Sequence, residues 1–548
     1  MDDARATSST AKGDISRGAA IVGVVAITVL ALGVRFADLG RAPFWRDEAV
    51  RAFYAEMEPG RLLRALQQDV NAPLFQLLLH YWAKLFGTGE FALRSLGAIL
   101  GGLTPLALYL ALARPLGRGV GLAAALLVAM NAGLILYSQE LSVYAMLVLF
   151  VVVAVGAFDR VARGGGWGAV AILSASLAGM AYTHMWSVLC WASLGIAAVT
   201  AAVVGRMQAG RWPAWFWRYA AAQAVALILF APWLRVSIQQ AASSTMDILP
   251  AHVSASAVLL ESLSFWYGAQ IIPALLAATC VAAFVIGGRF WFRPGAPLWG
   301  GRFAALALAA SALLPLILSW AVDAWKPVYY PRYTLICVPG ILSMAAIAAT
   351  RIPLTAARVG LVALLAFSPL VSGLRRGLTL PSAVFAHSPL KALAARVSAE
   401  AKPGDVIVVY PEIYATTFNW YYRGDLPEVC YPALGRVELL DWHSYRSRLS
   451  DGDAPKRAVA YVREHLEAGG RVWVIYNPNY AGKMAQLDYG DSFKRFIYEL
   501  DLALPGSRET NNDFLSPGEF EIAGGTIRMR QHFGESREPV VVTICKPY

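Results

Sequence analysis

The chain has 548 residues, of which 57% are hydrophobic and only 15% are charged, and its mean hydropathy is +0.51. Soluble domains carry about 25% charged residues, so the composition excludes an ordinary soluble protein and indicates a polytopic membrane protein with a soluble part. The formal net charge of +11 does not indicate nucleic-acid binding, because the arginines lie mostly in short loops between apolar segments rather than on one soluble face.

The first apolar segment, residues 19–37, follows a polar tail over residues 1–17 that we expect to be cytoplasmic. We interpret the segment as a retained membrane span, because the tail is charge-balanced and no small-x-small cleavage site follows. Residues 38–92 then form the first extracytoplasmic loop. Within this loop, residues 73–86 predict an interfacial helix, because 14 helical residues reach about 21 Å and the hydrocarbon core is about 30 Å thick.

Ten further apolar segments make eleven expected spans in a transmembrane domain of residues 18–378. Most arginine-rich short loops then fall on one face of the membrane, which places that face in the cytoplasm. The arginines of the first outer loop conflict with this rule. With eleven spans, the C-terminal region lies outside. The ten segments lie at about residues 93–113, 119–137, 141–158, 167–185, 187–205, 215–234, 263–288, 303–322, 333–350 and 356–373.

The C-terminal region, residues 379–548, differs in composition and predicts a small extracytoplasmic α/β domain. Residues 405–410 and 471–476 are expected to be buried strands. Helices are expected at residues 388–401, 455–468 and 482–499.

Aromatic residues of this domain are expected to pack within it, and contact with a sugar or lipid is the less common alternative. Cys430 and Cys545 could pair outside the cell, but the sequence leaves their proximity open. The aromatic residues are Trp420, Tyr421, Tyr422 and Tyr461.

The segment Pro43-Phe44-Trp45-Arg46-Asp47-Glu48-Ala49 follows the first span. Adjacent carboxylates beside an arginine are costly near hydrocarbon, so they indicate a functional site. The alternative is that Asp47 and Glu48 merely begin and solvate an interfacial helix, since acidic residues favour helix N-termini.

Further polar residues near the ends of the apolar segments gather on the same predicted side of the membrane. Each is weak evidence alone, but solvated loop residues would have no reason to avoid the cytoplasmic side. They are Asn71, Glu90, Arg94, the junction Tyr137-Ser138-Gln139-Glu140, His184, Trp186, Lys326, Arg332 and Tyr333.

These residues suit sugar transfer from a lipid phosphate, which needs a base for the acceptor and cations for the departing phosphate. Asp47 can supply the base, and because neighbouring helical side chains point about 100° apart, one of Asp47 and Glu48 is expected to face the sugar. Arg332, Lys326 and Arg94 can contact the phosphate. For Arg332, ordinary anchoring at the interface is an equal alternative.

Glu140, beside an apolar span, is expected to pair with Arg46 or Arg94 and so hold the first loop. His80 and His184 are expected to pack or to form hydrogen bonds rather than to bind metal. No HxxxH, HxH or DxD cluster is present, so no cofactor is expected, although a divalent cation on the acidic residues is compatible with the sequence.

The ordered set of motifs resembles the membrane-embedded GT-C glycosyltransferases, especially the bacterial relatives of protein O-mannosyltransferases and lipid A aminoarabinose transferases. Trp45 before Asp47-Glu48 matches the first-loop pattern of that family. Asn71-Ala72-Pro73-Leu74 matches its His-Pro-Pro-Leu-like element. Ser138-Gln139-Glu140-Leu141-Ser142-Val143-Tyr144 matches its Ser-Gln-Glu-Ala-Arg-x-Tyr pattern, with Ser142 in place of the arginine. Arg332-Tyr333 matches a late Arg-Tyr pair.

The resemblance implies a GT-C-like fold, a polyprenyl-phosphate-linked sugar as donor and inversion at the anomeric carbon. It implies Asp47 as the acceptor-side catalytic residue with Glu48 close by, in a site facing the exterior of a bacterial cytoplasmic membrane. The partners are then the donor, membrane lipid and an acceptor lipid, glycan or protein. We expect the loop-positioning or substrate-binding residues to be Arg46, Asn71, Gln139, Glu140 and Tyr333.

Two other classes of protein remain open on sequence grounds. A secondary transporter or a flippase of lipid-linked substrates would also need polar residues in the membrane, but these usually lie midway through broken helices in related halves, and no inverted repeat is visible. A non-catalytic envelope scaffold or sensor would leave Asp47, Glu140 and Arg332 unexplained.

Overall fold

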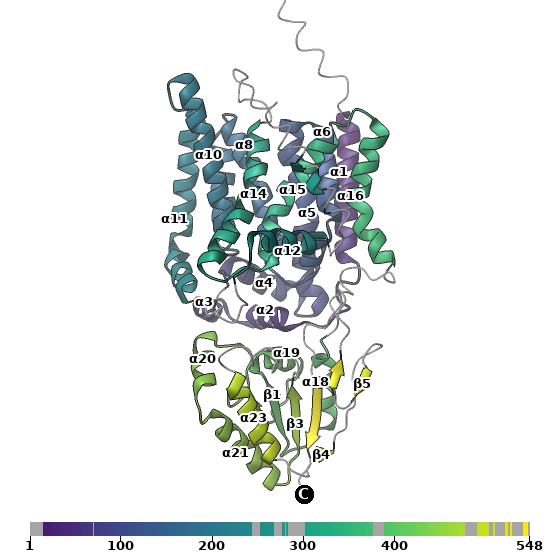
Figure 1. Cartoon of the computed structure of the whole chain (residues 1–548), viewed down its shortest axis with the longest axis vertical. Helices are drawn as coiled ribbons and strands as arrows, with labels where there is room; N and C mark the ends of the chain where they lie inside the picture. Colours follow the sequence, from purple (N-terminus) through teal and green to yellow (C-terminus); the bar gives the residue numbers. More distant parts are fainter. Residues whose placement is uncertain are drawn as a thin grey trace, which may run out of the picture. The chain divides into compact units, whose positions relative to one another are not determined.

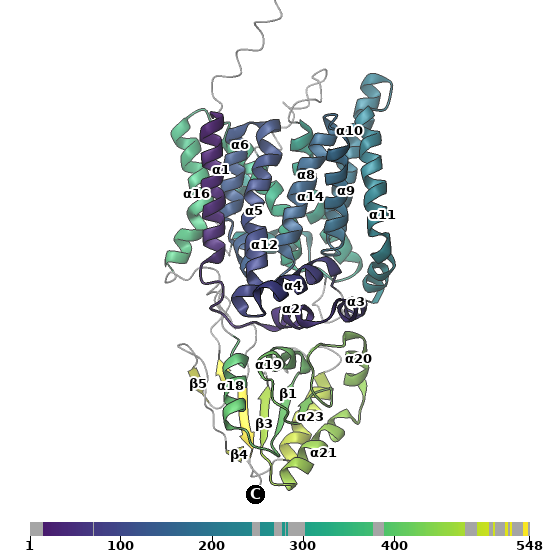
Figure 2. The same cartoon turned by 180° about the vertical axis from the view of Figure 1, so that it is seen from behind.

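The computed structural model describes residues 15–69, 71–243, 252–267, 274, 277–279, 281–282, 302–375, 388–476, 490–503, 508–509, 521–523, 526–528 and 541–545. The chain divides into two compact units. The first, the membrane unit, comprises Met1–Leu39, Asn71–Phe75 and Arg94–Pro381, and the second comprises Gly40–Val70, Gln76–Leu93 and Ser382–Tyr548. Figures 1 and 2 show a bundle of helices in the membrane unit and a sheet flanked by helices in the second.

The membrane unit contains, among the described residues, seven helical segments that are long and apolar enough to cross a bilayer. Helices of about 20 residues reach the roughly 30 Å thickness of the hydrocarbon core, so the protein is a multi-pass membrane protein. The segments are α1 (Arg17–Phe36), α5 (Glu90–Leu116), α8 (Tyr144–Ala162), α10 (Ser187–Ala209), α11 (Ala214–Ser243), α14 (Arg302–Trp325) and the continuous pair η2 (Pro331–Cys337) and α15 (Val338–Ala349).

One further span is broken in the middle. The sequence predicted an unbroken helix over residues 119–137, but α6 (Arg118–Met130) and α7 (Ala132–Gln139) meet at an angle of 56°. Asn131 between them has extended backbone geometry, and its side-chain Oδ1 accepts a hydrogen bond from the Leu134 amide at 3.1 Å. An asparagine in this position caps the new helix, which is why the chain changes direction there.

The remaining expected spans are shorter or lie outside the described residues. The segment at 167–185 forms α9 (Trp167–Ala181), which has only 15 residues, and the segment at 356–373 forms α16 (Thr355–Arg375), of which only Thr355–Ser368 counts as a shorter apolar helix. Most of residues 263–288 lie outside the described part of the chain, and only the end of α12 (Ala255–Tyr267) overlaps them. The described residues therefore hold seven spans, or eight with the broken pair, and not the expected eleven.

The first loop is helical for much of its length. It contains α2 (Arg46–Glu56), α3 (Pro59–Gln67) and α4 (Pro73–Phe86). Prolines are favoured at the first position of a helix because their missing N–H group needs no partner there, and both α3 and α4 begin at one. The bounds of α4 agree with the predicted interfacial helix, and α4 is not among the segments that meet the criteria for a span.

The C-terminal part of the second unit is built on a five-stranded sheet with the order β2-β1-β3-β7-β4. β1 pairs in parallel with β2 and β3, and β3 pairs with β7 in antiparallel register. The strands are β1 (Val406–Tyr410), β2 (Glu428–Cys430), β3 (Val472–Tyr476), β4 (Arg508–Glu509) and β7 (Val541–Cys545), with a separate pair of β5 (Glu521–Ala523) and β6 (Thr526–Arg528).

Helices cover both faces of the sheet. Because side chains alternate along a strand, Val406 and Val408 pack with α20, α21 and α23, whereas Ile407 and Val409 pack with α18 and α19. The predicted strands and α/β class are confirmed, and the predicted helices correspond to α18, α21 and α23. The helices are α18 (Leu390–Glu400), α19 (Ala415–Tyr421), α20 (Trp442–Ser450), α21 (Ala454–Glu467) and α23 (Gly490–Ala503).

The strand order excludes a disulfide between Cys430 and Cys545. Cys430 ends β2 and Cys545 ends β7, and β1 and β3 lie between these strands. Three strand spacings of about 4.8 Å separate the two backbones, which is more than the roughly 7 Å that a disulfide allows. Cys430 is accordingly a buried free thiol.

Candidate active site

The first turn of α2 gives its two adjacent carboxylates different surroundings. Trp45 precedes the helix with an extended backbone, and its amide donates to Glu48 Oε2 at 3.3 Å. Glu48 is the third helical residue, so its side chain can reach back to the residue that precedes the helix. The side chain is buried, with only 2% of the residue exposed. The helix-starting role that the sequence allowed for both acids is therefore the role of Glu48.

Asp47 keeps part of its carboxylate accessible, with 19% of the side chain exposed. Its Oδ1 forms an ion pair with Arg46 Nε at 3.1 Å, and its backbone carbonyl accepts a hydrogen bond from Arg51 Nη1 at 2.6 Å. The Asp47 carboxylate thus lies in the first turn of α2, beside the guanidinium of Arg46, while Arg51 binds its backbone carbonyl. An ionised, partly exposed carboxylate can accept a proton from a substrate.

Three of the predicted polar segments meet at one end of the membrane unit through a chain of aromatic rings. Tyr137 contacts Tyr144 edge to face at 5.1 Å between ring centroids, and Tyr144 lies 5.4 Å from His184. Tyr333 completes the chain, 5.3 Å from His184 and stacked on Trp186 at 4.8 Å. These rings bring the residues around 137–144, 184–186 and 333 together, as the sequence predicted.

The junction Tyr137-Ser138-Gln139-Glu140 is tied to the end of α1. Gln139 Nε2 donates to the carbonyls of Val34 and Ala37 at 3.1 and 3.0 Å. Arg35 Nε donates to Ser138 Oγ at 3.2 Å, and Arg35 Nη1 donates to the Ala129 carbonyl at 2.9 Å, near the break between α6 and α7. The buried guanidinium therefore supplies a donor to the Ala129 carbonyl, which lies in the last turn of α6, where carbonyls lack helical partners.

A cavity of about 10 Å³ lies beside this junction. It has room for about one water molecule, so a sugar does not fit into it. Its lining includes Arg35, Thr104, Tyr137, Ser138 and Tyr144.

Two of the predicted phosphate-binding cations lie close together in the sequence: Lys326 directly follows α14, and Arg332 is in the first turn of η2. The Arg332 guanidinium lies 4.8 Å from the centre of the Tyr330 ring, and Lys326 Nζ donates to the Ala241 carbonyl at 3.5 Å. Asp323, which the sequence analysis did not single out, organises this turn by accepting hydrogen bonds from the amides of Val328 and Tyr329, both at 2.9 Å. The available signal was an isolated carboxylate near the end of an apolar span.

The other predicted residues of the membrane unit also lie at or near helix ends. Arg94 is buried and donates to the Leu39 carbonyl at 3.2 Å, which ties α5 to the chain that follows α1. Glu140 is buried and ends α7. Asn71 lies two residues before α4. In the first turn of that helix, the Leu74 amide donates a hydrogen bond to the Tyr182 carbonyl at 3.0 Å. The pairing of Glu140 with Arg46 or Arg94 stays a prediction.

The structure thus assembles two groups of candidate residues. Arg46, Asp47 and Glu48 belong to the second unit. The other group belongs to the membrane unit, and the approach of the two groups to one cavity stays a prediction. The second group is Asn71, Arg94, Gln139, Glu140, Lys326, Arg332 and Tyr333.

The two histidines behave as packing and hydrogen-bonding residues. His80 is buried and its Nδ1 lies 3.0 Å from the Ala55 carbonyl oxygen, while His184 Nδ1 accepts from the Trp186 amide at 3.1 Å. Within the described ranges, no group of three or more His, Cys, Asp or Glu side chains is arranged to hold a metal ion.

Residues of the α/β domain that the sequence analysis treated as packing residues contact the helix that carries Asp47. Trp420 lies 5.2 Å from Phe53 between ring centroids, and the Tyr421 hydroxyl accepts a hydrogen bond from the Phe44 amide at 2.6 Å. Tyr422 is buried against Phe418 and belongs to the domain core, whereas Tyr461 is 40% exposed. No local sequence pattern signals the contacts of Trp420 and Tyr421, because they join residues hundreds of positions apart.

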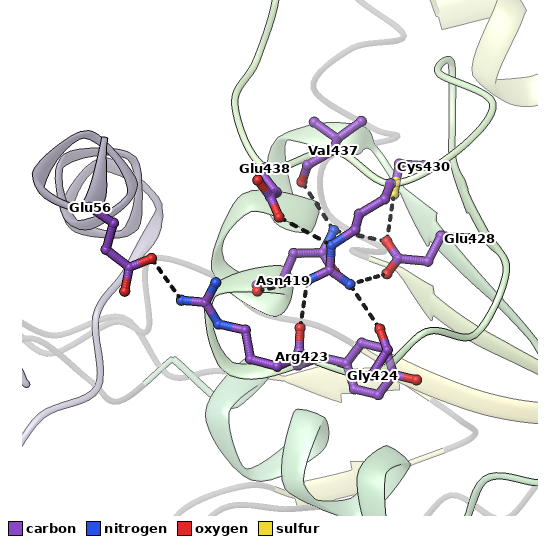
Figure 3. Close-up of polar contacts among 10 residues, drawn as sticks. Glu56, Asn419, Arg423, Gly424, Glu428, Cys430, Val437 and Glu438 are labelled. Carbon is purple, nitrogen blue, oxygen red and sulfur yellow. Dashed lines mark hydrogen bonds and ion pairs between the residues drawn. The ribbon is translucent and has the colours of Figure 1, made fainter. Parts of the chain in front are cut away.

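A polar network around the buried carboxylate of Glu428 holds the end of α19 (Figure 3). Arg436 Nη1 forms an ion pair with Glu428 Oε1 at 2.9 Å, and Arg436 Nη2 donates to the carbonyls of Tyr422 and Asn419 at 2.7 and 3.2 Å. Asn419 Nδ2 donates to Glu428 Oε2 at 2.8 Å. Burial raises the pKa of Glu428, and the hydrogen bond from Asn419 and the charge of Arg436 offset part of that rise.

Comparison with protein families finds a match over residues 70–235 to the family described as dolichyl-phosphate-mannose-protein mannosyltransferase. The matched segment includes Arg94, Gln139 and Glu140 and ends before Arg332. A comparison with curated proteins finds no match.

Two solved structures share the fold of this chain. ArnT from Cupriavidus metallidurans bound to undecaprenyl phosphate is 14% identical, with a TM-score of 0.54, and the match covers 85% of this chain and 94% of that one. The oligosaccharyltransferase AglB from Archaeoglobus fulgidus, in complex with an inhibitory peptide and a dolichol-phosphate, is 12% identical, with a TM-score of 0.52, and the match covers 88% and 72% of the two chains. The predicted GT-C-like fold is therefore confirmed.

Proposed function

We propose that the chain, which has a GT-C-like fold and matches the mannosyltransferase family model over residues 70–235, transfers a sugar from a polyprenyl-phosphate donor to an acceptor lipid, glycan or protein of the cell envelope. The reaction takes place at the outer face of a bacterial cytoplasmic membrane and inverts the anomeric carbon. One observation carries the residue assignment: Glu48 caps α2, whereas the carboxylate of Asp47 beside it stays partly exposed and is paired with Arg46.

In this reaction Asp47 acts as the base. Its carboxylate takes the proton of the acceptor hydroxyl or amine as that atom forms a bond to the anomeric carbon. The bond between the anomeric carbon and the phosphate oxygen breaks on the opposite face of the sugar, and the polyprenyl phosphate leaves with the electron pair. Arg46 holds the Asp47 carboxylate through the ion pair at 3.1 Å.

The leaving phosphate needs positive charge, because its own negative charge increases as the bond breaks. Arg332 and Lys326 supply it, and Arg94 supports the loop that brings the base to the sugar. An arginine suits this task since its guanidinium can donate two parallel hydrogen bonds to a phosphate. The undecaprenyl phosphate and dolichol-phosphate named for the two solved structures support a donor of this chemical class.

Replacement of the base tests the proposal. Purified protein in nanodiscs is given radiolabelled polyprenyl-phosphate sugar and a membrane extract as acceptor. We expect Asp47→Asn to lower transfer by about 1,000-fold, the range for loss of a general base, while the unfolding temperature changes by less than about 2 °C. Glu48→Gln is the matched control, because its amide oxygen can still accept from the Trp45 amide.

Two results would contradict the proposal. Transfer by Asp47→Asn at the wild-type rate would remove Asp47 from the chemistry. Counterflow of the lipid-linked sugar by the wild-type protein without any transfer would indicate a transporter instead.

A further inference from the structure

The end of α19 contacts the first-loop segment at both ends of α2. We name the three residues responsible, Trp420, Tyr421 and Arg423, the α19 clamp. The clamp and α2 belong to the same compact unit, although about 370 residues separate them along the chain.

Tyr421 holds the chain just before α2. Its hydroxyl accepts a hydrogen bond from the Phe44 amide at 2.6 Å and donates one to Glu90 Oε1 at 3.1 Å. Lys391 Nζ forms an ion pair with the same Glu90 oxygen at 2.5 Å. Burial, followed by the nearby negative charge of Glu90, raises the pKa of Tyr421 well above its ordinary value, so the hydroxyl keeps the proton that it donates.

Trp420 and Arg423 hold the body and the far end of α2. The Trp420 ring packs against Phe44 at 6.0 Å and against Phe53 at 5.2 Å between centroids. The Arg423 guanidinium lies 4.7 Å from the Trp420 ring and 5.3 Å from the Phe53 ring. Its Nη2 reaches Glu56 Oε2 at 3.3 Å, the ion pair on the left of Figure 3.

Within the α/β domain, the polar network of Figure 3 holds the clamp. Arg436 binds the carbonyls of Asn419 and Tyr422, on either side of Trp420 and Tyr421, and the buried carboxylate of Glu428 holds Arg436. Networks of this kind keep a surface in one arrangement, because every member would lose a partner if it moved. The clamp is therefore a rigid surface against which α2 is placed.

We propose that the α/β domain acts in catalysis through the α19 clamp and that Tyr421 is a positioning residue for Asp47. Phe44 lies three positions before Asp47 and joins the first turn of α2 through Trp45, so the hydrogen bond to Tyr421 sets where that turn begins. A shift of about 1 Å in a catalytic group can cost a hundredfold in rate. This inference rests on the proposed function of Asp47.

The first test compares two tyrosines of the same domain. Tyr421→Phe removes the hydroxyl and keeps the ring, and Tyr461→Phe does the same at an exposed site on α21. Tyr421→Phe loses the hydrogen bonds to the Phe44 amide and to Glu90, and we expect it to lower kcat about tenfold, with an unchanged Kd for the donor and an unchanged unfolding temperature. Tyr461→Phe is expected to leave all three quantities unchanged. An unchanged kcat in Tyr421→Phe would overturn the inference.

The second test exchanges the charges of the ion pair at the far end of α2. Arg423→Glu faces Glu56 with a like charge and is expected to lower kcat. The double variant Arg423→Glu with Glu56→Arg restores an ion pair of opposite order, and we expect it to recover part of the lost kcat. A double variant no more active than Arg423→Glu would contradict a role for this contact in positioning.

The third measurement does not depend on activity. Hydrogen exchange of the full-length protein in nanodiscs, followed by mass spectrometry, reports the opening of residues 44–56. We expect faster exchange there in Tyr421→Phe than in the wild type or Tyr461→Phe. If the wild-type protein transfers no sugar, the proposed function fails while faster exchange still supports the clamp. Unchanged exchange in residues 44–56 would refute the clamp whatever the activity.

Discussion

At the scale of single residues, position within a helix turn separates two chemically similar groups. Glu48, the third residue of α2, reaches back to the Trp45 amide and is buried, whereas Asp47, one position earlier, projects beside Arg46 with 19% of its side chain exposed. An extra methylene lets glutamate form the reciprocal cap that aspartate at the second position does not form here. The proposed role of Asp47 as the base rests on this difference.

Arg332 gives a prediction about donor binding. Its guanidinium is half-buried over the Tyr330 ring, and a hydrogen bond from a charged group is worth about 1.5–3 kcal/mol. We expect Arg332→Ala to weaken binding of polyprenyl phosphate about tenfold to a hundredfold, measured by titration calorimetry in nanodiscs. Arg351→Ala, an exposed arginine of the same unit, is the control. An unchanged Kd in Arg332→Ala would remove Arg332 from the phosphate site.

Glu412 gives a prediction about pH. The residue is fully buried after β1, and burial raises its pKa to about 7, with the charge of Arg448 offsetting part of the effect. In the unfolded chain this pKa is about 4.3. Between these values the folded state binds more protons than the unfolded state, so this group's contribution to stability is complete below about pH 4 and is lost as the pH rises through 7.

In the wild type, we therefore expect Glu412 to lower the free energy of unfolding by about 3 kcal/mol as the pH rises from 4 to 8. This decrease should be absent in Glu412→Gln. Thermal unfolding in detergent at several pH values measures this pH dependence. Glu467→Gln, which changes an exposed residue of α21, is the control. Parallel pH dependences for the wild type and Glu412→Gln would contradict the prediction.

Asp405 works in the opposite sense: its burial is outweighed by hydrogen bonds from Arg471 and its neighbours, which lower its pKa, so its contribution to stability is lost as the pH falls.

At the scale of elements, the site end of the membrane unit depends on close approach between helices. A Cβ atom on Gly101 of α5 would overlap Ser138 Oγ and would lie 2.7 Å from Ser138 Cβ and 3.0 Å from Arg35 Nε. Only glycine lets α5 approach α7 this closely, while Arg35 bridges Ser138 and the carbonyl of Ala129. The break between α6 and α7 and the close contact of α7 with α5 therefore depend on each other, because Arg35 and Ser138 take part in both.

We expect Gly101→Ala to destabilise the protein by about 1–3 kcal/mol, the usual cost of overpacking, and to lower transfer because Ser138 and Gln139 move. Gly33→Ala in α1 is the matched control, since nothing lies within 4 Å of its Cβ position and alanine is favoured over glycine in a helix by about 1 kcal/mol. Thermal unfolding by tryptophan fluorescence compares the two. Equal unfolding temperatures would contradict the prediction, because they would show that α5 and α7 can move apart at little cost in stability.

At the scale of the whole molecule, the membrane unit and the second unit meet different physical demands. The membrane unit satisfies its backbone within long helices, as a bilayer requires, whereas the second unit has a sheet with two hydrophobic faces, each covered by helices. The first loop from residue 40 to residue 70 belongs to the second unit, so the helix that carries Asp47 shares a folding unit with the α/β domain.

The sidedness of the membrane gives a prediction about topology. In a background where the five cysteines are replaced by serine, Lys456→Cys places a thiol on the exposed face of α21, and Met207→Cys places one near the end of α10, where the residue is 82% exposed. We expect a membrane-impermeant maleimide to label Lys456→Cys in intact spheroplasts and Met207→Cys only after permeabilisation. The reverse pattern would place the α/β domain in the cytoplasm.

The sequence by itself determined the features that depend on local periodicity and length. Apolar runs of about 20 residues predicted the spans, the 14-residue apolar run from Pro73 to Phe86 predicted α4, and two short β-branched runs predicted β1 and β3, because each pattern lies within one element. The group of polar residues at Tyr137, His184 and Tyr333 was also predictable, since consecutive spans return the chain to the same side of the membrane.

Only the tertiary structure decided which of these residues contact one another. An apolar run has the same composition whether its helix is straight or broken. The bend at Asn131 could therefore not be predicted from the sequence, because it depends on how Arg35 and Gly101 pack against the broken span. Nothing in the residues near Asp47 indicates that Tyr421, 377 positions from Phe44, holds the start of its helix. Contacts of this kind arise from the folding of distant segments onto one another, and no pattern within either segment encodes them.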